Sequence, residues 1–355
     1  MKKAKKILVA PLDWGLGHAT RLIPIIRYLK ESDCEIIIAA SGNGAQILRE
    51  YFPEVKLIAL EGYKVQYGKR FFQWHIILQI PKILRAIKHE HQWLQKIIDE
   101  YRIDAVISDN RYGLHSQKIP SVLITHQLNI QTPGLLQSGT VKTVDNYINK
   151  FTECWVPDFK GKNSLAGQLS QRFGYSKKIK HIGPLSRLNF QNEKIGVVYD
   201  YLGIVSGPEK QRTIFQNALV EALVRTGKKS LILCGLPQEN FKKQKDNVTM
   251  VSHLDSQNLI QAVTSSKTII CRSGYSTIMD LIALQRGAII VPTPGQTEQE
   301  YLANHLDGKF GFCQLQQKKL LKITAFPEIT DSSNVVLPVN DMKPVSDFLN
   351  KYLPQ

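Results

Sequence analysis

Apolar runs alternate with amphipathic stretches through the first half of the chain. Short runs such as EIIIAA and SVLIT are apolar and rich in β-branched residues, a pattern typical of strands buried on both faces of a parallel sheet. The pattern predicts strands at 6–11, 35–40, 55–60, 104–108, 121–125 and 154–156, with helices at 18–31, 43–51, 70–100 and 140–150. This alternation of strands and helices indicates a doubly wound α/β domain.

The same pattern restarts after residues 180–195, where Gly, Pro and polar residues are mixed and indicate a linker between domains. Further strands are expected near 196–205, 229–234, 248–251, 267–271 and 287–291. We therefore predict an α/β protein of two Rossmann-like, doubly wound domains, residues 1–185 and 186–345, with a final helix over 346–355. Where this helix packs does not follow from the sequence.

The charge balance of the chain implies an anionic partner. The chain has 355 residues and a net charge of +16, which favours nucleic acid, a phospholipid surface or a phosphorylated substrate. The sequence contains no zinc-finger or RNP pattern, and its basic residues are spread along the chain. Both observations argue against nucleic acid.

Cysteine spacing and the N-terminus indicate the compartment. The cysteines are far apart and form no CxxC pair, which predicts a reduced, cytoplasmic protein. The apolar stretch after the basic N-terminus is too short for a secretory signal, and no run reaches the roughly 18 apolar residues of a membrane span. The five positions are Cys34, Cys154, Cys234, Cys271 and Cys313.

The stretch DWGLGHATR places His18 in a glycine turn between a predicted strand and a predicted helix. A helix N-terminus lowers the pKa of a nearby imidazole and favours its neutral form, so His18 is a candidate general base. The alternative is a capping or surface histidine. The turn does not fit the dinucleotide pattern GxGxxG, because Thr20 stands where that pattern needs glycine.

Asp109 follows another predicted strand, in the stretch VISDNRYG. Ligands of doubly wound sheets bind outside the carboxyl ends of the strands. Asp109 is therefore a candidate for acceptor binding or general base catalysis. The alternative is an Asp-Asn pair that only forms a turn.

The second half offers two turns that could hold a diphosphate. VSGPE (205–209) and RSGYST (272–277) each follow a predicted strand and precede a helix, so their backbone amides and the helix N-termini could bind phosphate. The alternative is that the hydroxyl side chains of the second turn only cap a helix.

Residues 68–97 combine aromatic and apolar side chains with cations. A helix of this composition binds anionic lipid surfaces. The alternative is a helix that packs on the sheet by its apolar face, with Pro81 beginning its second half. The residues concerned are Phe71, Phe72, Trp74, Ile76, Ile77 and Leu78, with Lys69, Arg70, Lys82, Arg85 and Lys88.

Residues 271–306 resemble the donor-site signature of GT-B glycosyltransferases, and most closely glycosyltransferase family 28, the family of the peptidoglycan UDP-N-acetylglucosamine transferase. Four further stretches agree with that family in order and spacing: GLGHATRLIP, IPSVLITHQLN, HIGPLSR and VSGPE. The resemblance implies two domains that face a cleft, with the acceptor on the first and a nucleotide-sugar donor on the second.

The resemblance also implies roles for single residues. Asp280 matches the acid that binds the ribose hydroxyls, Gln299 and Glu300 match the pair that reads the donor sugar, and His18 matches the histidine proposed to assist the acceptor. The other implied donor residues are Arg187, Ser206, Gly207, Leu254, Ser273, Gly274, Tyr275, Ser276 and Thr277; the acceptor-side residues are Gly15, Gly17, Arg21 and His126. The chain departs from the family in having Asp280 for glutamate and Glu300 for glutamine, and its glycine loops are shorter.

These observations predict an inverting transferase that moves a sugar, N-acetylglucosamine by resemblance, from a UDP donor to a glycan or lipid-linked acceptor. The sequence has no Asp-x-Asp pair, so we expect the enzyme to need neither a metal nor a cofactor. Two alternatives stay open. One is a UDP-sugar hydrolase, because related hydrolases carry a Gly-x-Gly-His-x-x-Arg loop. The other is a non-enzymatic sugar-nucleotide sensor or membrane-surface scaffold.

Overall fold

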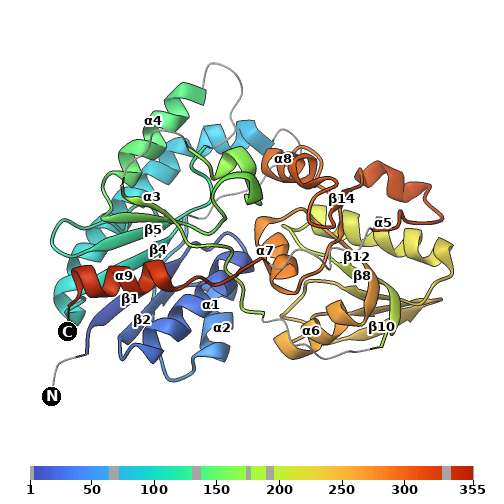
Figure 1. The fold of residues 1–355 in the computed structure, drawn as a ribbon, viewed down its shortest axis with the longest axis horizontal. Coiled ribbons are helices and arrows are strands. Elements are labelled where there is room, and N and C mark those ends of the chain that lie inside the picture. Colours follow the sequence, from blue (N-terminus) through green and yellow to red (C-terminus); the bar gives the residue numbers. More distant parts are fainter. Residues whose placement is uncertain are drawn as a thin grey trace. The chain divides into compact units, whose positions relative to one another are not determined.

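The chain divides into two compact units. The computed structural model describes residues 4–63, 72–129, 137–172, 177–188, 196–329 and 337–354. The first unit comprises Met1–Arg187 and Val339–Gln355, and the second comprises Leu188–Pro338. Figure 1 shows that each unit has its own sheet with helices packed around it.

The first unit contains a parallel sheet with the strand order β3-β2-β1-β4-β5-β6-β7 among the described residues. All of its neighbouring strands pair parallel. The strands are β1 (Lys6–Pro11), β2 (Glu35–Ala40), β3 (Lys56–Ala59), β4 (Ala105–Asp109), β5 (Ser121–Ile124), β6 (Glu153–Val156) and β7 (Ile179–His181). The helices are α1 (Leu16–Glu31), α2 (Gly42–Tyr51), α3 (Phe72–Tyr101), α4 (Gln137–Ile148) and α9 (Lys343–Tyr352).

Alternate residues of β1 pack against different helices, as strand geometry requires. Ile7 and Val9 belong to the core that contains α1. Leu8 and Ala10 belong to the core that contains the second half of α3. The strand is thus buried on both faces, which explains its continuous apolar run.

The second unit repeats this construction with the strand order β10-β11-β9-β8-β12-β13-β14. Its β10–β11 pair is antiparallel and its other neighbouring strands are parallel. The strands are β8 (Tyr199–Ile204), β9 (Ser230–Leu233), β10 (Lys242–Lys245), β11 (Val248–Val251), β12 (Ser266–Cys271), β13 (Ile289–Ile290) and β14 (Cys313–Gln314). The helices are α5 (Gln211–Thr226), α6 (Ser256–Thr264), α7 (Tyr275–Ala283) and α8 (Thr297–Leu306).

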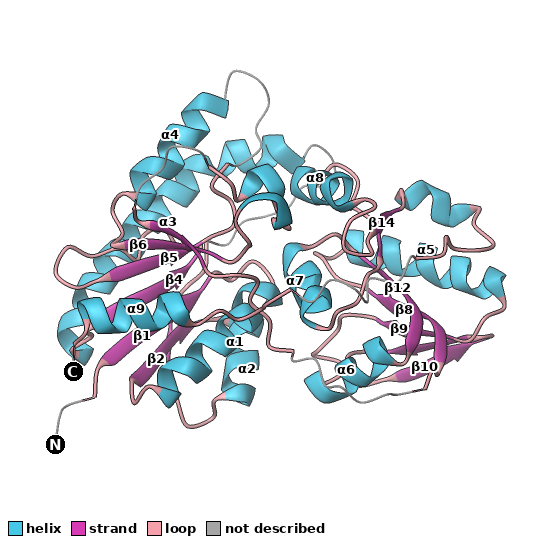
Figure 2. Cartoon of the chain, in the orientation of Figure 1, coloured by secondary structure: helices cyan, strands magenta, loops and turns pink. Residues whose placement is uncertain are grey.

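The structure confirms two Rossmann-like domains, and Figure 2 shows the helices and strands of each. The sequence did not predict three edge strands. The β10 sequence is KKQK and is exposed throughout, β7 (IKH) overlaps the start of the stretch interpreted as a linker, and β14 (CQ) has only two residues. Because an edge strand needs no apolar run to pair on one side, periodicity cannot detect such segments.

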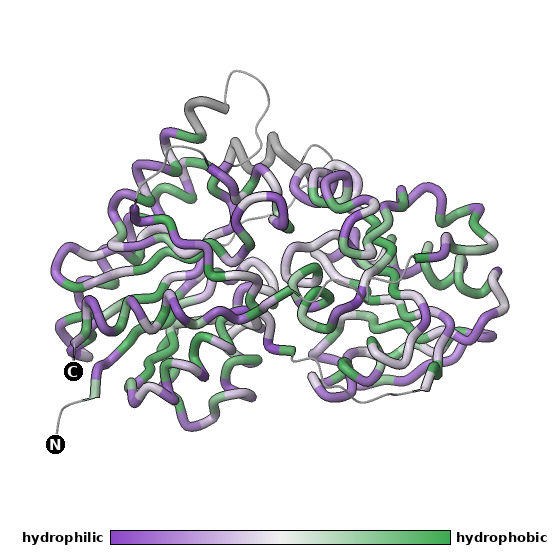
Figure 3. The backbone as a smooth tube through the Cα atoms, viewed as in Figure 1, coloured by the Kyte–Doolittle hydropathy of each residue, from purple (hydrophilic) through white to green (hydrophobic). Residues whose placement is uncertain are grey.

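The C-terminal helix α9 packs on the first unit. Val345 and Phe348 are fully buried in the same core as α1, and the rings of Phe348 and Trp155 meet edge to face at 5.6 Å. Figure 1 shows α9 lying beside the first sheet, and Figure 3 shows apolar residues concentrated along the central strands of both units. This contact places the helix whose position the sequence left open.

All five cysteines are free. Burial raises the pKa of the Cys154 and Cys271 thiols to about 12, so both are inert apolar side chains at neutral pH. Among the described residues, no helix has the length and apolar content needed to span a bilayer.

Candidate functional site

The turn after β1 brings His18 to the carboxyl edge of the first sheet. Gly15 is the N-cap of α1 with φ of 91°, a left-handed conformation that glycine adopts without steric cost. Gly17 and His18 then form part of the first turn of the helix. The helix therefore begins two residues before the position expected from the sequence, and His18 lies inside it.

His18 is one member of a buried cluster with Asp109 and Arg21. The Nδ1 atom of His18 lies 3.2 Å from Oδ1 of Asp109 and 3.0 Å from Nη2 of Arg21. Arg21 donates from Nε to Oδ2 of Asp109 at 2.6 Å and from Nη2 to Oδ1. The side chain of His18 is 15% exposed, while those of Arg21 and Asp109 are 2% and 0% exposed. The imidazole is thus the only member of the three that retains solvent access.

The cluster keeps His18 neutral and Asp109 ionised. Burial lowers the pKa of His18 most strongly, Arg21 and His126 lower it further, and these causes together outweigh the opposing effect of Asp109. Burial by itself would raise the pKa of Asp109, but the charges and hydrogen bonds of Arg21 and His18 hold it below its ordinary value. A neutral imidazole beside a carboxylate can accept a proton.

The cluster lies where the strand order of the sheet reverses. β1 and β4 are neighbours, yet the chain proceeds from β1 through β2 and β3 before it returns to β4. Such a reversal is the usual ligand site of a doubly wound sheet. His126, the second residue after the next strand β5, is 4% exposed. It is one of the groups that lower the pKa of His18, so it is close to the cluster.

A second ion pair, missed by the sequence analysis, holds the backbone beside Asp109. Arg111 is fully buried and donates to the Pro11 carbonyl at 2.7 Å and to Glu90 of α3 at 2.7 Å. Glu90 also accepts a hydrogen bond of 2.7 Å from the Tyr63 hydroxyl. Arg111 lies only two residues after Asp109 in the sequence. This proximity could have indicated that it is part of the same site.

The predicted diphosphate turns lie at the corresponding position in the second unit. β8 and β12 are neighbours at the point where that strand order reverses, and the turns containing Ser206 and Ser273 follow them. Gly207 has φ of 110° and is exposed. Gly274 is the N-cap of α7, so the first-turn amides of that helix form a potential anion site.

Some side chains of the 273–277 turn have internal roles. Ser273 is fully buried and donates to the Gln299 carbonyl at 2.8 Å, and Tyr275 is 4% exposed. Ser276 and Thr277 are partly exposed. A ligand of this turn would therefore meet the backbone amides, Ser276 and Thr277.

Gln299 and Glu300 are both anchored to their own loop. Oε1 of Gln299 accepts from the Thr293 amide at 2.9 Å, and Oε1 of Glu300 accepts from the Gly295 amide at 2.8 Å. These bonds orient both side chains at the N-terminus of α8. The N-cap residue Gln296 also accepts from the Gln299 amide.

The remaining predicted donor residues lie in three places. Asp280 is a partly exposed residue of α7, and Leu254 lies in the loop between β11 and α6. Arg187 belongs to the first unit, where it donates to the Tyr51 hydroxyl at 3.1 Å. The structure therefore brings His18, Arg21, Asp109 and His126 together, and does not place Arg187 in the unit that contains the other predicted donor residues.

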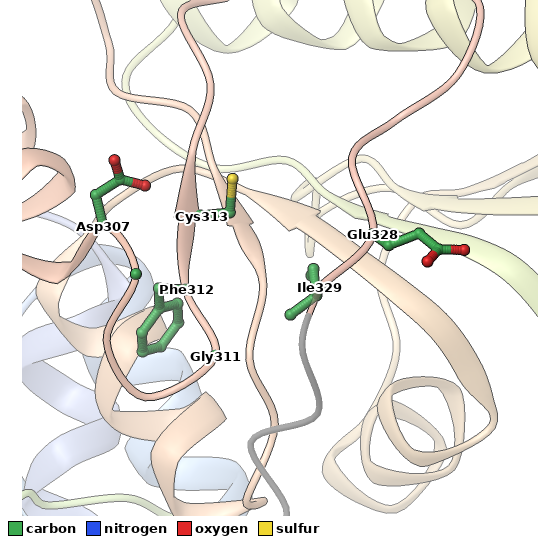
Figure 4. A pocket seen from close by; sticks show the side chains of 7 residues that line it. Asp307, Gly311, Phe312, Cys313, Glu328 and Ile329 are labelled. Atoms are coloured by element: carbon green, nitrogen blue, oxygen red, sulfur yellow. The ribbon is translucent and has the colours of Figure 1, made fainter.

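One hollow of about 280 Å³ opens in the second unit between the end of α8, β14 and the segment around Ile329. Figure 4 shows Asp307, Phe312, Cys313, Glu328 and Ile329 on its wall. No predicted site residue lines it, so it supports none of the predicted roles.

Comparison with known proteins identifies the class of enzyme. Residues 208–329 match the glycosyltransferase family 28 C-terminal domain. An uncharacterized glycosyltransferase of Methanosarcina mazei is 24% identical, over 83% of this chain and 81% of its own. The UDP-N-acetylglucosamine–N-acetylmuramyl-(pentapeptide) pyrophosphoryl-undecaprenol N-acetylglucosamine transferase of Acetivibrio thermocellus is 23% identical, over 88% and 86% of the two chains.

Solved structures agree on the fold. The kitacinnamycin glycotransferase superposes with a TM-score of 0.68 and 13% identity over 99% of this chain and 100% of that one. MurG of Acinetobacter baumannii superposes with a TM-score of 0.56 and 15% identity over 98% and 99%. The chain is a glycosyltransferase of the GT-B class. Its second unit carries the family 28 C-terminal domain, and the whole chain resembles that family.

Proposed function

We propose that this glycosyltransferase moves a sugar from a UDP-sugar to a glycan or lipid-linked acceptor with inversion, without a metal or cofactor, and that the sugar is N-acetylglucosamine. The observation that carries the proposal is the neutral, partly accessible His18, held by buried Asp109 in a chain whose second unit matches a family 28 domain. The relatives named as N-acetylglucosamine transferases support the sugar.

In this mechanism His18 accepts the proton of the acceptor hydroxyl. We assign the proton of neutral His18 to Nδ1, from which it is donated to Oδ1 of Asp109, while Nη2 of Arg21 donates to Asp109 and not to His18. Nε2 is then the proton acceptor. The acceptor oxygen then attacks the anomeric carbon as the bond from that carbon to the diphosphate breaks. A single displacement of this kind inverts the anomeric centre.

The second unit binds the donor and stabilises the leaving diphosphate. In this proposal the amides at the N-terminus of α7 and the turn at Ser206 and Gly207 donate to phosphate oxygens; the Gly274 N-cap of α7 and the exposure of Gly207 support this role. Asp280 binds the ribose hydroxyls, and the backbone groups of Leu254 form hydrogen bonds with the uracil base. Gln299 and Glu300 recognise the sugar. The predicted contribution of positive charge by Arg187 would come from the first unit. With these donors, and with no Asp-x-Asp pair in the sequence, the leaving group needs no metal.

The exposed part of α3 supports an acceptor at an anionic lipid surface. Ile80 and Leu84, one helical turn apart, are 45% and 46% exposed, and Lys82, Arg85 and Lys88 near them are exposed cations. The aromatic and basic side chains of residues 68–78 lie outside those that the structure describes. We propose a cytoplasmic enzyme that reaches its acceptor at the membrane surface.

A donor panel tests the function. The protein is incubated with UDP-, GDP- and TDP-sugars, with and without membrane extract and with and without EDTA, and nucleotide release is measured. We expect UDP release that requires the extract and is unaffected by EDTA. UDP release at the same rate without extract would instead indicate a UDP-sugar hydrolase. If the protein bound no uridine nucleotide, both enzyme functions would be excluded, and the non-enzymatic sensor or scaffold would remain.

Asp280→Ala is expected to weaken UDP binding by about 10- to 100-fold, because a hydrogen bond to a charged group contributes about 1.5–3 kcal/mol. Calorimetry with UDP and with 2′-deoxy-UDP separates the ribose contact from a general effect. The wild type should prefer UDP, whereas the variant should bind the two alike. A variant that keeps the wild-type preference would contradict the role of Asp280.

The acid limb of the pH profile follows from the pKa of His18. A general base must be deprotonated, and the pKa of His18 lies below its ordinary value of 6.5, so the neutral form persists to lower pH. We expect the acid limb of kcat/KM to lie below pH 6.5. A limb above that value would show that His18 is not the titrating base.

A further inference from the structure

Arg272 is a buried cation without a carboxylate partner among the described residues. It directly follows β12 and is 1% exposed. Burial lowers the pKa of its guanidinium to about 10, so it remains charged at neutral pH. Its guanidinium carbon lies 4.0 Å from the centre of the Phe215 ring. A buried charge without a counter-charge is costly for the free protein.

The guanidinium joins three loops that follow neighbouring strands. It donates to the carbonyls of Val291 and Pro292 at 3.2 Å each, and to the carbonyl of Gln211 at 3.3 Å. Gln211 is the first residue of α5, which follows the turn after β8; Arg272 begins the turn after β12, and Val291 follows β13. One side chain thus joins the start of α5 after the Ser206 turn, the turn at Ser273 and the loop that leads to Gln299.

An anion at these turns would compensate the charge. The Nε atom of Arg272 is buried and has no hydrogen-bond partner among the described residues, and the N-terminus of α7 three residues later adds positive potential. The carboxyl edge here is therefore electropositive for a structural reason that is separate from the turn amides.

We propose that Arg272 is the positioning residue of the nucleotide-diphosphate site: it fixes the three loops and supplies the buried positive charge that favours a diphosphate over an uncharged nucleoside. This inference rests on the proposed binding of a UDP donor by the second unit.

The test compares UDP with uridine. Calorimetry on the full-length chain measures both ligands with the wild type, Arg272→Met and Arg272→Lys. We expect Arg272→Met to weaken UDP binding by about 10-fold or more and to leave uridine binding nearly unchanged. Lysine retains the charge but cannot span three carbonyls. The UDP affinity of Arg272→Lys should therefore lie between those of the wild type and Arg272→Met, and this variant provides the test if Arg272→Met does not fold.

Arg286 provides a matched control in the same unit. Its guanidinium also donates to backbone carbonyls, among them those of Val263 at 2.9 Å and of Ser266, but Ser266 begins β12 at the opposite edge of the sheet. Arg286→Met should leave the ratio of UDP to uridine affinity unchanged.

Two results would overturn the inference: equal weakening of UDP and uridine in the Arg272 variants, or a UDP affinity equal to that of the wild type. If neither Arg272 variant folds while Arg286→Met does, Arg272 is structural and the inference fails. Failure of the proposed UDP-donor site is distinct, because the wild type itself would then bind neither ligand, whereas a UDP-sugar hydrolase would still bind UDP and leave the inference testable.

Discussion

His18→Ala is expected to lower kcat by about 10²- to 10⁴-fold, the usual contribution of a general base, while the affinity for UDP stays unchanged. The imidazole lies in the first unit, and the residues predicted to bind UDP, apart from Arg187, belong to the second. Loss of the imidazole should therefore remove the proton acceptor and leave donor binding intact. Steady-state kinetics with saturating donor, together with calorimetry of UDP binding, measure the two effects separately.

Glu31→Ala is the control for this variant, because Glu31 is an exposed residue at the other end of α1. It should have the kcat of the wild type. Full activity in His18→Ala, or an equal loss of kcat and of UDP affinity, would contradict the assignment of His18 as the base.

Asp109→Asn is expected to reduce kcat by about 10²-fold or more and to move the acid limb of kcat/KM further toward low pH. The carboxylate raises the pKa of His18 through its charge and its hydrogen bond. Removing that charge therefore lowers the pKa of His18 further, and the weakened base stays neutral at lower pH. Because Arg21 would lose its buried carboxylate, the free energy of unfolding should also fall by about 3–5 kcal/mol.

Asp145→Asn separates catalysis from stability. Asp145 forms another little-exposed ion pair of the first unit, with both terminal nitrogens of Arg172. Urea unfolding should show a comparable loss of stability in this variant, whereas kcat and the acid limb should match those of the wild type. If both variants change kcat alike, the effect of Asp109 is structural.

The sequence predicted the sheet cores because buried parallel strands need continuous apolar runs. It could not predict strands such as KKQK, whose pairing depends on a neighbour and not on burial. The position of α9 also depends on a distant contact, between Phe348 and Trp155, which no local pattern encodes.

For the site, the sequence indicated the direction of the His18 pKa but assigned it to the helix terminus. In the structure burial is the largest cause, and Arg21 also lowers the pKa. Positions 18 and 21 lie on one face of a helix by their spacing, so their proximity was predictable. Their contact with Asp109 was not, because it requires β1 and β4 to be neighbours in the sheet.

The fate of the sugar tests the central claim most directly. A UDP-sugar labelled in the sugar is incubated with the wild type and with His18→Ala, with and without membrane extract, and the label is followed. We expect the wild type to place the label on an acceptor in the extract, to release almost no free sugar without it, and to lose this transfer in the variant. Free labelled sugar released at the same rate without extract would contradict the account, because water and not an acceptor hydroxyl would then be the nucleophile.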